Sequence, residues 1–337
     1  MDSKDYVKQI AEQSDSYDQT IQAIIAFDSA VRYDDARKIY LQNSFCLPGR
    51  RFNHNPTNED EKVTPDIAEQ LSDQYGIIAE IKITASSDQD FERAEAQVRK
   101  YDVDLIGWKT KDEKINIHDL SLLIHDLNRG KAARWFAKKS FVHKLTLIVC
   151  ARILDHKVSF KIEKSFGTFS DTRLEKKFID PVAIPLENPE ILKAISSVKF
   201  YDAQPPVEYT MNILWMNIFN EIAQEEGAVK EKTIIVDCKV LTKMLSERYA
   251  FRQEDHRQPK VPREAWVRQA LDTLVEIDYA LVDLKDKDKY HVKYSHPRKE
   301  DMIVFFAKRH FEEMNKPKRK AGQDQQLQFP GISKESK

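Results

Sequence analysis

The sequence has little cysteine and no long apolar run, and these absences exclude several classes of protein. Its three cysteines, Cys46, Cys150 and Cys238, are scattered and form no C-x-x-C unit, which argues against a disulfide framework or a zinc ribbon. No segment approaches the roughly eighteen apolar residues of a membrane-spanning helix, and the polar N-terminus lacks the apolar segment of a signal peptide. We therefore expect a soluble protein of the reducing cytoplasm, with no membrane partner.

The motifs of several common enzyme classes are also missing. The chain contains no G-x-x-x-x-G-K-S loop, no G-x-S-x-G elbow and no H-E-x-x-H pair. His118 and His125 could share one face of a helix, but without further ligands we interpret them as surface or core histidines. With a net charge of −1, the chain as a whole does not attract nucleic acid electrostatically. Any attraction must come from a local basic patch.

The length and the residue patterns predict an α/β protein with more than one domain. The chain has 337 residues, of which 41% are hydrophobic and 32% charged, enough to bury a sizeable core beneath a charged surface. In the first half, hydrophobic periodicity and turn residues indicate an alternation of helices and strands. The predicted elements are a helix over 17–42, strands over 63–71 and 77–84, a helix over 86–102, a short strand over 103–108, a helix over 119–139, and a hairpin over 145–153 and 157–162.

The second half follows a different pattern. Residues 180–206 hold five of the thirteen prolines, which indicates a connector between a domain over 1–179 and another over 207–315. Helical segments over 207–226 and 261–277 precede a hairpin over 279–294, and this is the order of a winged-helix domain. Residues 316–337 form a polar tail that we expect to be disordered.

Charged residues interrupt two of the predicted strands in the first half. Alternate side chains of a strand share a face, so Glu80 and Lys82 project together while Ile81 enters the core. If the two strands pair around the turn near Gly76, Asp66 lies beside Glu80. Two converging carboxylates suit Mg²⁺ or Mn²⁺, the Ile81 carbonyl could add a ligand, and Lys82 could orient or deprotonate a water molecule.

The helix that follows these strands carries two polar residues at helical spacing. Gln97 and Tyr101 are four positions apart, so they project from neighbouring positions on one face. An amide and a phenol that point back toward the strands could order a phosphate, a nucleotide or Lys82. The alternative is a helix whose tyrosine packs in the core and whose glutamine is exposed.

Together, the stretches TPDI, AEIK and QVRKY resemble the motifs of the PD-(D/E)xK nuclease superfamily, in its RecB-like branch. The resemblance covers residues 17–110 and implies a restriction-endonuclease-like core, a mixed sheet flanked by helices. It also implies that Asp66 and Glu80 bind the metal, that Lys82 serves the nucleophilic water, and that Gln97 and Tyr101 support the site.

Two features depart from that superfamily's pattern. Many members add an acidic or histidine ligand from an upstream helix or loop, but the helix predicted over 17–42 has no glutamate. The residues left to supply such a ligand are Asp28, Asp34, Asp35 and His54, with Glu59 and Glu61 less suited in a solvated loop. Some RecB-like nucleases hold an iron–sulfur cluster with four cysteines, which three scattered cysteines exclude.

The C-terminal region offers basic residues that could meet DNA phosphates. They lie on the second helix and on the hairpin, and are Arg263, Arg268, Lys285, Lys287, Lys289 and Lys293. Acidic residues alternate with them, and winged helices also serve as protein-interaction modules. The alternatives of DNA contact and protein contact therefore both stay open.

These observations favour a metal-dependent nuclease that hydrolyses DNA phosphodiester bonds, with a role in defence, restriction, recombination or repair. A single active site cuts one strand at a time, so blunt cleavage of a duplex would require a homodimer. The competing hypothesis is a non-catalytic nuclease-like scaffold whose winged helix acts as a DNA-binding regulator or protein adaptor. A third is that the motif match is accidental and the N-terminal domain is an unrelated α/β module.

Overall fold

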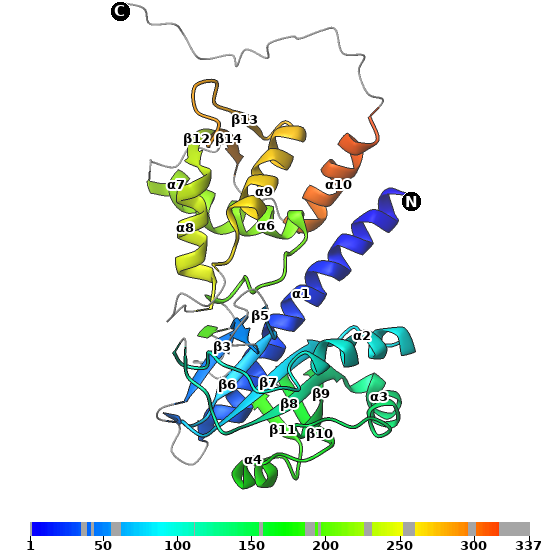
Figure 1. Ribbon diagram of the computed structural model, residues 1–337. Helices are drawn as coiled ribbons and strands as arrows, with labels where there is room; N and C mark the ends of the chain where they lie inside the picture. The colour runs from blue at the N-terminus through cyan, green and yellow to red at the C-terminus, as the bar shows by residue number, and fades with distance from the viewer. Residues whose placement is uncertain are drawn as a thin grey trace, which may run out of the picture.

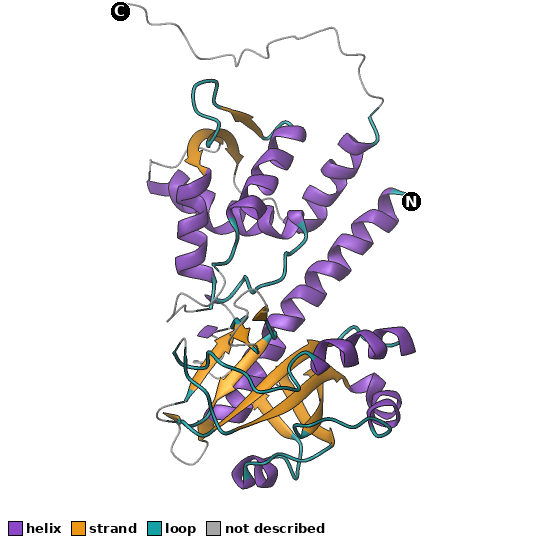
Figure 2. Cartoon of the chain, in the orientation of Figure 1, coloured by secondary structure: helices purple, strands orange, loops and turns teal. Residues whose placement is uncertain are grey.

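The protein is a mixed α/β molecule whose N-terminal half is a curled mixed sheet flanked by helices (Figures 1 and 2). A computed structural model describes residues 2–34, 39–41, 44–54, 62–110, 112–154, 158–185, 193–194, 197–225, 231–251, 260–295 and 301–316. The tail expected to be disordered lies outside these ranges, apart from Lys316. No helix in the described ranges combines the length and the apolar character needed to span a membrane.

Seven strands form the main sheet, in the order β11-β10-β9-β8-β7-β6-β3. The three inner strands β7, β8 and β9 run parallel, and the remaining neighbours pair antiparallel. The strands are β3 (Phe45–Pro48), β6 (Ile67–Gln70), β7 (Tyr75–Lys82), β8 (Ile117–His125), β9 (Leu145–Leu154), β10 (Val158–Phe166) and β11 (Val182–Pro185). Small two-stranded pairs join β1 (Tyr33–Asp34) to β2 (Ile39–Tyr40) and β4 (Phe52–Asn53) to β5 (Lys62–Val63).

Helices cover both faces of this sheet and enclose two apolar cores. Helices α2 (Asp88–Arg99) and α3 (Arg129–Phe136) pack on the face that Ile78 and Leu122 occupy, with the short 3-10 helix Asp126–Asn128 leading into α3. Helix α1 (Ser3–Arg32) covers the opposite face, where Ile77 and Ile81 point, and α4 (Thr172–Lys177) adds Leu174 to that core. Helix α2 confirms the helix predicted over 86–102, and Ser87 and Asp90 cap its start with a reciprocal capping box.

The first helix differs from its predicted range at both ends. Helix α1 begins after the N-cap Asp2, whose side chain accepts a hydrogen bond from the Asp5 N–H, and it ends at Arg32. Its first turns are polar because much of their surface faces solvent, but Tyr6 packs against Phe311 of the C-terminal region and Ile10 is buried. The tertiary contacts of these turns extend the helix beyond the apolar stripe that the sequence displays.

Residues 119–139 were predicted as one helix, and that prediction was wrong. Most of the first half is β8, which lies between β7 and β9 and is buried on both faces from His118 to Ile124. A strand covered on both faces reads as a continuous apolar run, which periodicity cannot separate from a buried helix. The strand predicted over 103–108 was also wrong, since that segment makes only isolated bridges at Ile106.

The C-terminal region combines helices with a small antiparallel sheet of order β12-β14-β13. The predicted helix over 261–277 and the predicted hairpin are confirmed, and the helix buries Trp266, Val267 and Leu274. The elements are α6 (Val207–Ile213), a π-helical segment (Leu214–Phe219), α7 (Asn220–Glu225), β12 (Glu231–Asp237), α8 (Cys238–Tyr249), α9 (Glu264–Glu276), β13 (Ala280–Val282), β14 (Lys289–Ser295) and α10 (Met302–Met314).

Helix α1 connects the two halves of the molecule, because its N-terminal part packs along α10 (Figure 1). The Tyr6 hydroxyl donates to Glu208 Oε1 at 2.9 Å, and His310 Nδ1 lies 2.7 Å from the same oxygen. Three elements thus meet at one buried carboxylate. Within the predicted connector, Val182–Pro185 form the edge strand β11, and residues 201–206 run past α1.

Candidate active site

The pairing of β6 with β7 brings Asp66 and Glu80 together. Ile67 lies opposite Ala79 in this antiparallel pair, so the next positions outward are Asp66 and Glu80. Asp66 Oδ2 accepts a hydrogen bond from the Ile81 N–H at 2.7 Å, which fixes the carboxylate against the carboxyl end of β7. The adjacency expected from the turn near Gly76 is therefore present.

Lys82 extends from the same face of β7 as Glu80. Its Nζ lies 2.6 Å from Glu80 Oε1, and Ile81 between them is buried on the opposite face, in the core under α1. Burial lowers the pKa of Lys82, but the carboxylates of Asp66 and Glu80 outweigh this effect and raise it. Lys82 is therefore a fixed ammonium group whose charge balances one of the two carboxylates.

Gln97 and Tyr101 reach this site from α2 and the turn after it. Gln97 Nε2 donates to the Tyr101 hydroxyl at 2.6 Å, and that hydroxyl lies 3.0 Å from Glu80 Oε2. The same hydroxyl is 3.0 Å from the carbonyl oxygen of Thr64, just before Asp66. Burial, followed by the charges of Glu80 and Asp66, raises the pKa of Tyr101, so its proton stays on the phenol.

The balance of charge at this site suits a divalent cation. Asp66 and Glu80 bring two carboxylates to one partly buried position, and Lys82 supplies one positive charge. Burial, and then the charge of Glu80, raises the pKa of Asp66 to about 7. A cation held by Asp66 and Glu80, with the backbone of Ile81 beside them, would relieve that repulsion, so the residues fit a hard metal ion.

The upstream acid candidates do not join this site in the part of the chain that the structure describes. Asp28 pairs with Arg32, and Arg32 Nε lies 3.0 Å from Glu69 Oε2. Cys46 completes this cluster, in which ligand atoms of Asp28, Cys46 and Glu69 lie within 4.8 Å of one another. His54 is exposed after β4, whereas Asp35, Glu59, Glu61 and the side chain of Asp34 lie outside the described residues.

The Asp28, Cys46 and Glu69 cluster was not found from the sequence. Its residues come from α1, β3 and β6, and Glu69 projects toward α1 because it is two positions from Ile67. Burial raises the pKa of Cys46 and of Glu69, which keeps a proton in the cluster. The Arg32 guanidinium lies between the two carboxylates, so it already balances negative charge in the cluster.

Two connector residues that no sequence motif pointed to also approach the candidate site. Burial, and then the charge of Asp66, raises the pKa of Tyr201 to about 12. The neighbouring Asp202 contributes to the raised pKa of Asp66 and forms an ion pair with Arg263 Nη2 at 3.0 Å. Arg263, at the start of α9, is thereby linked to the edge of the sheet that carries Asp66.

The other basic residues of the C-terminal region lie in a mixed-charge surface. Arg268 Nη2 contacts Glu264 Oε1 at 2.7 Å and Asp288 Oδ1 at 2.6 Å. Lys289 pairs with Asp286 at 3.2 Å, and Lys293 Nζ lies 3.3 Å from the carbonyl of Asp278. Lys285 and Lys287 are exposed in the loop between β13 and β14, beside the fully exposed Leu284.

The two histidines that could have shared a helix face are separated by the strand that carries them. An odd spacing on β8 places His118 and His125 on opposite faces. His118 is buried, stacks on His143 with ring centroids 3.9 Å apart, and its Nε2 lies 3.0 Å from the Tyr101 carbonyl oxygen. His118 is therefore a core histidine that supports the turn holding Tyr101.

Comparison of the chain with models of protein families, with curated proteins and with solved structures finds no match. Any assignment of function consequently depends on the residues and the geometry described above. The strongest feature is the convergence of Asp66, Glu80, Lys82 and Tyr101 at one edge of the sheet.

Proposed function

We propose that the protein is a metal-dependent nuclease that hydrolyses phosphodiester bonds in DNA, with its active site at Asp66, Glu80 and Lys82. The observation that carries the proposal is the register of β6 and β7, which places Asp66 opposite Glu80 at the end of a strand. Tyr101, in the turn after α2, bonds to Glu80, and Gln97 on α2 bonds to Tyr101, in agreement with the supporting roles that the resemblance to PD-(D/E)xK nucleases implies. Three sequence motifs thus meet at one point.

The arrangement of the sheet supports a restriction-endonuclease-like core. An antiparallel pair, β6 and β7, is followed by α2 and then by the parallel strands β8 and β9, with helices on both faces. The carboxyl ends of parallel strands are a common position for active sites in α/β proteins, and Lys82 ends β7. This order favours the nuclease fold over an unrelated α/β module.

Each residue has a role that follows from its contacts. Asp66 and Glu80 would hold Mg²⁺ or Mn²⁺, whose chemistry is to activate water and to offset negative charge on the phosphate. Lys82 would release Glu80, to which it is now bonded, and stabilise charge on a phosphate oxygen. Tyr101 fixes the orientation of Glu80, and Gln97 fixes Tyr101.

The C-terminal region supports a winged-helix module that positions DNA or recruits a protein. The element order β12, α8, α9, β13, β14 and the sheet order β12-β14-β13 support this proposal, because they agree with the order expected of a winged helix. Arg263 forms an ion pair with Asp202, which lies near Asp66, whereas Lys285 and Lys287 lie in the loop of the hairpin. Arg263 would contact the DNA nearest the cleaved bond, and the loop lysines would contact phosphates farther away.

One observation favours a second candidate, a nuclease-like scaffold without catalysis. Among the described residues, the upstream acid Asp28 is paired with Arg32 and contributes nothing to the Asp66 site. A scaffold of this kind would bind DNA or a protein partner through α9 and the hairpin. Metal binding separates the two proposals, since catalysis needs it.

The first experiment compares DNA cleavage by the native protein and by Asp66→Asn, Glu80→Gln and Lys82→Ala. Plasmid, linear duplex and single-stranded DNA are incubated with Mg²⁺, with Mn²⁺ and with EDTA. Cleavage that needs metal and falls at least 100-fold in all three variants is the expected result, because each variant removes one charged group from the site. Lys176→Ala is the matched control, since Lys176 is exposed on α4.

A second measurement tests metal binding without catalysis. Thermal unfolding is followed with increasing Mn²⁺, which should raise the midpoint of the native protein and of Lys176→Ala. The midpoint of Asp66→Asn should not respond. If Mn²⁺ stabilises none of the proteins and no DNA is cut, the nuclease proposal is wrong and the scaffold proposal remains.

A further inference from the structure

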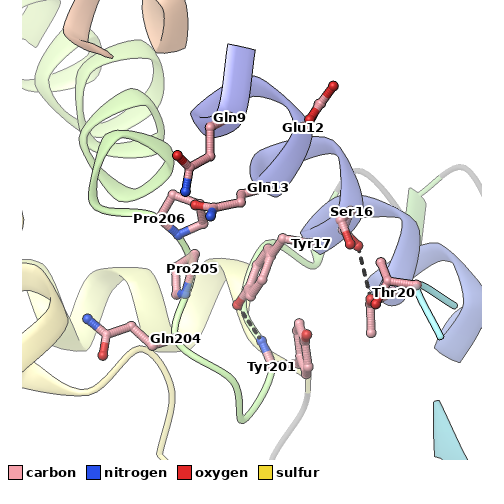
Figure 3. Close-up of a pocket in the computed structure, with 11 residues that line it drawn as sticks. Gln9, Glu12, Gln13, Ser16, Tyr17, Thr20, Tyr201, Gln204, Pro205 and Pro206 are labelled. Atoms are coloured by element: carbon pink, nitrogen blue, oxygen red, sulfur yellow. Dashed lines mark hydrogen bonds between the residues drawn. The ribbon is translucent and has the colours of Figure 1, made fainter. Parts of the chain in front are cut away.

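A cavity of about 730 Å³ opens where α1 passes the residues after β7 and the connector segment 201–206 (Figure 3). Most of the described residues that line it carry uncharged polar groups, and Glu12 is the one charged residue among them. The amides and hydroxyls belong to Gln9, Gln13, Gln204, Ser16, Thr20 and Thr84. Such a lining offers both hydrogen-bond donors and hydrogen-bond acceptors. The described lining includes no lysine or arginine that would attract a phosphate.

Two aromatic rings and two prolines form the apolar part of this cavity. The ring centroids of Tyr17 and Tyr201 are 4.7 Å apart, with 34° between the ring planes. The Tyr17 hydroxyl donates to the carbonyl of Ala203 at 3.1 Å and accepts from the Tyr201 N–H at 3.2 Å, as Figure 3 shows for the second contact. Tyr17 is thus fixed in the core, while the half-buried Tyr201 presents its ring to the cavity.

The cavity adjoins the candidate active site. Thr84 follows Lys82 by two residues at the carboxyl end of β7, and it lines the cavity. Tyr201 lies close enough to Asp66 for that carboxylate to raise its pKa. A nucleotide whose phosphate met Lys82 would therefore have the aromatic and amide lining within reach of its base.

We propose that this cavity binds one unstacked nucleobase of a single-stranded nucleic acid, beside the phosphate that Asp66, Glu80 and Lys82 would cleave. Tyr201 stacks on the base, and the amide of Gln13 bonds its polar edge. A base inside a duplex cannot enter without being unpaired and unstacked, so the cavity selects single strands or frayed ends. This inference rests on the proposed nuclease function for its biological meaning, although base binding can be measured without it.

The test uses the full chain and a single-stranded oligodeoxynucleotide that carries the fluorescent base 2-aminopurine. Fluorescence is titrated in EDTA, so that no strand is cut, for the native protein and for Tyr201→Ala, Tyr201→Phe and Gln13→Ala. One base–aromatic stack corresponds to a loss of affinity of about tenfold, which we expect for Tyr201→Ala. Tyr201→Phe keeps the ring and should bind as the native protein does.

Tyr75→Ala serves as the matched control, because Tyr75 is a half-buried tyrosine at the start of β7, at the opposite end of that strand from Lys82 and outside the cavity. It should bind the oligonucleotide normally, and circular dichroism should show that each variant is folded. Equal affinity of Tyr201→Ala and the native protein, or equal affinity for single-stranded and duplex probes, would overturn the base-binding proposal.

The outcome for base binding is separable from the outcome for nuclease activity. If the native protein cuts DNA and Tyr201→Ala both binds and cuts as well, the cavity has no role and the nuclease proposal stands. If binding depends on Tyr201 but no DNA is cut with any metal, base recognition stands and catalysis fails. Cleavage that prefers single strands and loses this preference in Tyr201→Ala would support both.

Discussion

The buried imidazole of His118 should make the protein lose stability in mild acid. The side chain is 3% exposed, and burial lowers the pKa of His118 to about 4. The hydrogen bond to the Tyr101 carbonyl oxygen acts in the opposite direction, and the stacked His143 adds to the lowering. Protonation in the folded protein is therefore disfavoured.

The sign and the size of the effect follow from this shift. In the unfolded chain a histidine takes up its proton near pH 6.5, whereas the folded protein takes it up only near pH 4. Between these values the unfolded state binds more protons, so the free energy of unfolding falls as the pH falls. The loss amounts to roughly 2 kcal/mol between pH 7 and pH 5, and to about 3 kcal/mol in full.

Urea unfolding at pH 7 and pH 5 measures this loss for the native protein and for His118→Gln. Glutamine keeps an N–H donor for the Tyr101 carbonyl but does not titrate, so His118→Gln should lose about 2 kcal/mol less than the native protein over this range. His125→Gln, on the half-buried end of the same strand, is the matched control and should behave as the native protein does. An equal loss of stability in the native protein and in His118→Gln would refute the reasoning.

Three further substitutions test the packing and the polar contacts. Gly76→Ala should destabilise the protein by about 1–3 kcal/mol in urea unfolding, because a Cβ there lies 2.7 Å from Trp108 Cη2; an unchanged midpoint would contradict this close packing. Arg32→Leu leaves the buried carboxylate of Glu69 without its guanidinium, so the free energy of unfolding at pH 8 should fall by about 3–5 kcal/mol in urea unfolding. An unchanged free energy would contradict this role of Arg32. Tyr101→Phe removes a hydroxyl but keeps the ring, so we expect the free energy of unfolding to fall by roughly 1–2 kcal/mol. The same variant should cleave DNA more slowly with unchanged DNA affinity, and a normal cleavage rate would show that the hydroxyl does not orient the site.

The local features of the molecule were predictable from the sequence. The helix that follows β7 and the hairpin of the C-terminal region follow from side-chain patterns within a few residues. The position of Asp66 beside Glu80 followed from the sequence only on the condition that the two strands pair around the turn before Gly76, and the register itself came from the structure. Information of this kind is carried by neighbours in the chain.

Features that depend on distant segments were not predictable. The run from Ile117 to His125 is a strand because β7 and β9 pair with its edges and helices cover both its faces. The residues of the run do not indicate which segments will pack against it. Tyr201 approaches Asp66, and Glu69 meets Asp28, only after the chain has folded back on itself.

Local side-chain patterns therefore specified the capped and periodic elements, and they made the pairing of the two strands that bear the candidate catalytic residues an expectation. The tertiary structure decided which residues surround that pair, including the cavity beside it. The physical reason is that turns, caps and hydrophobic periodicity are short-range interactions, whereas burial and charge compensation depend on every segment that packs at the same place.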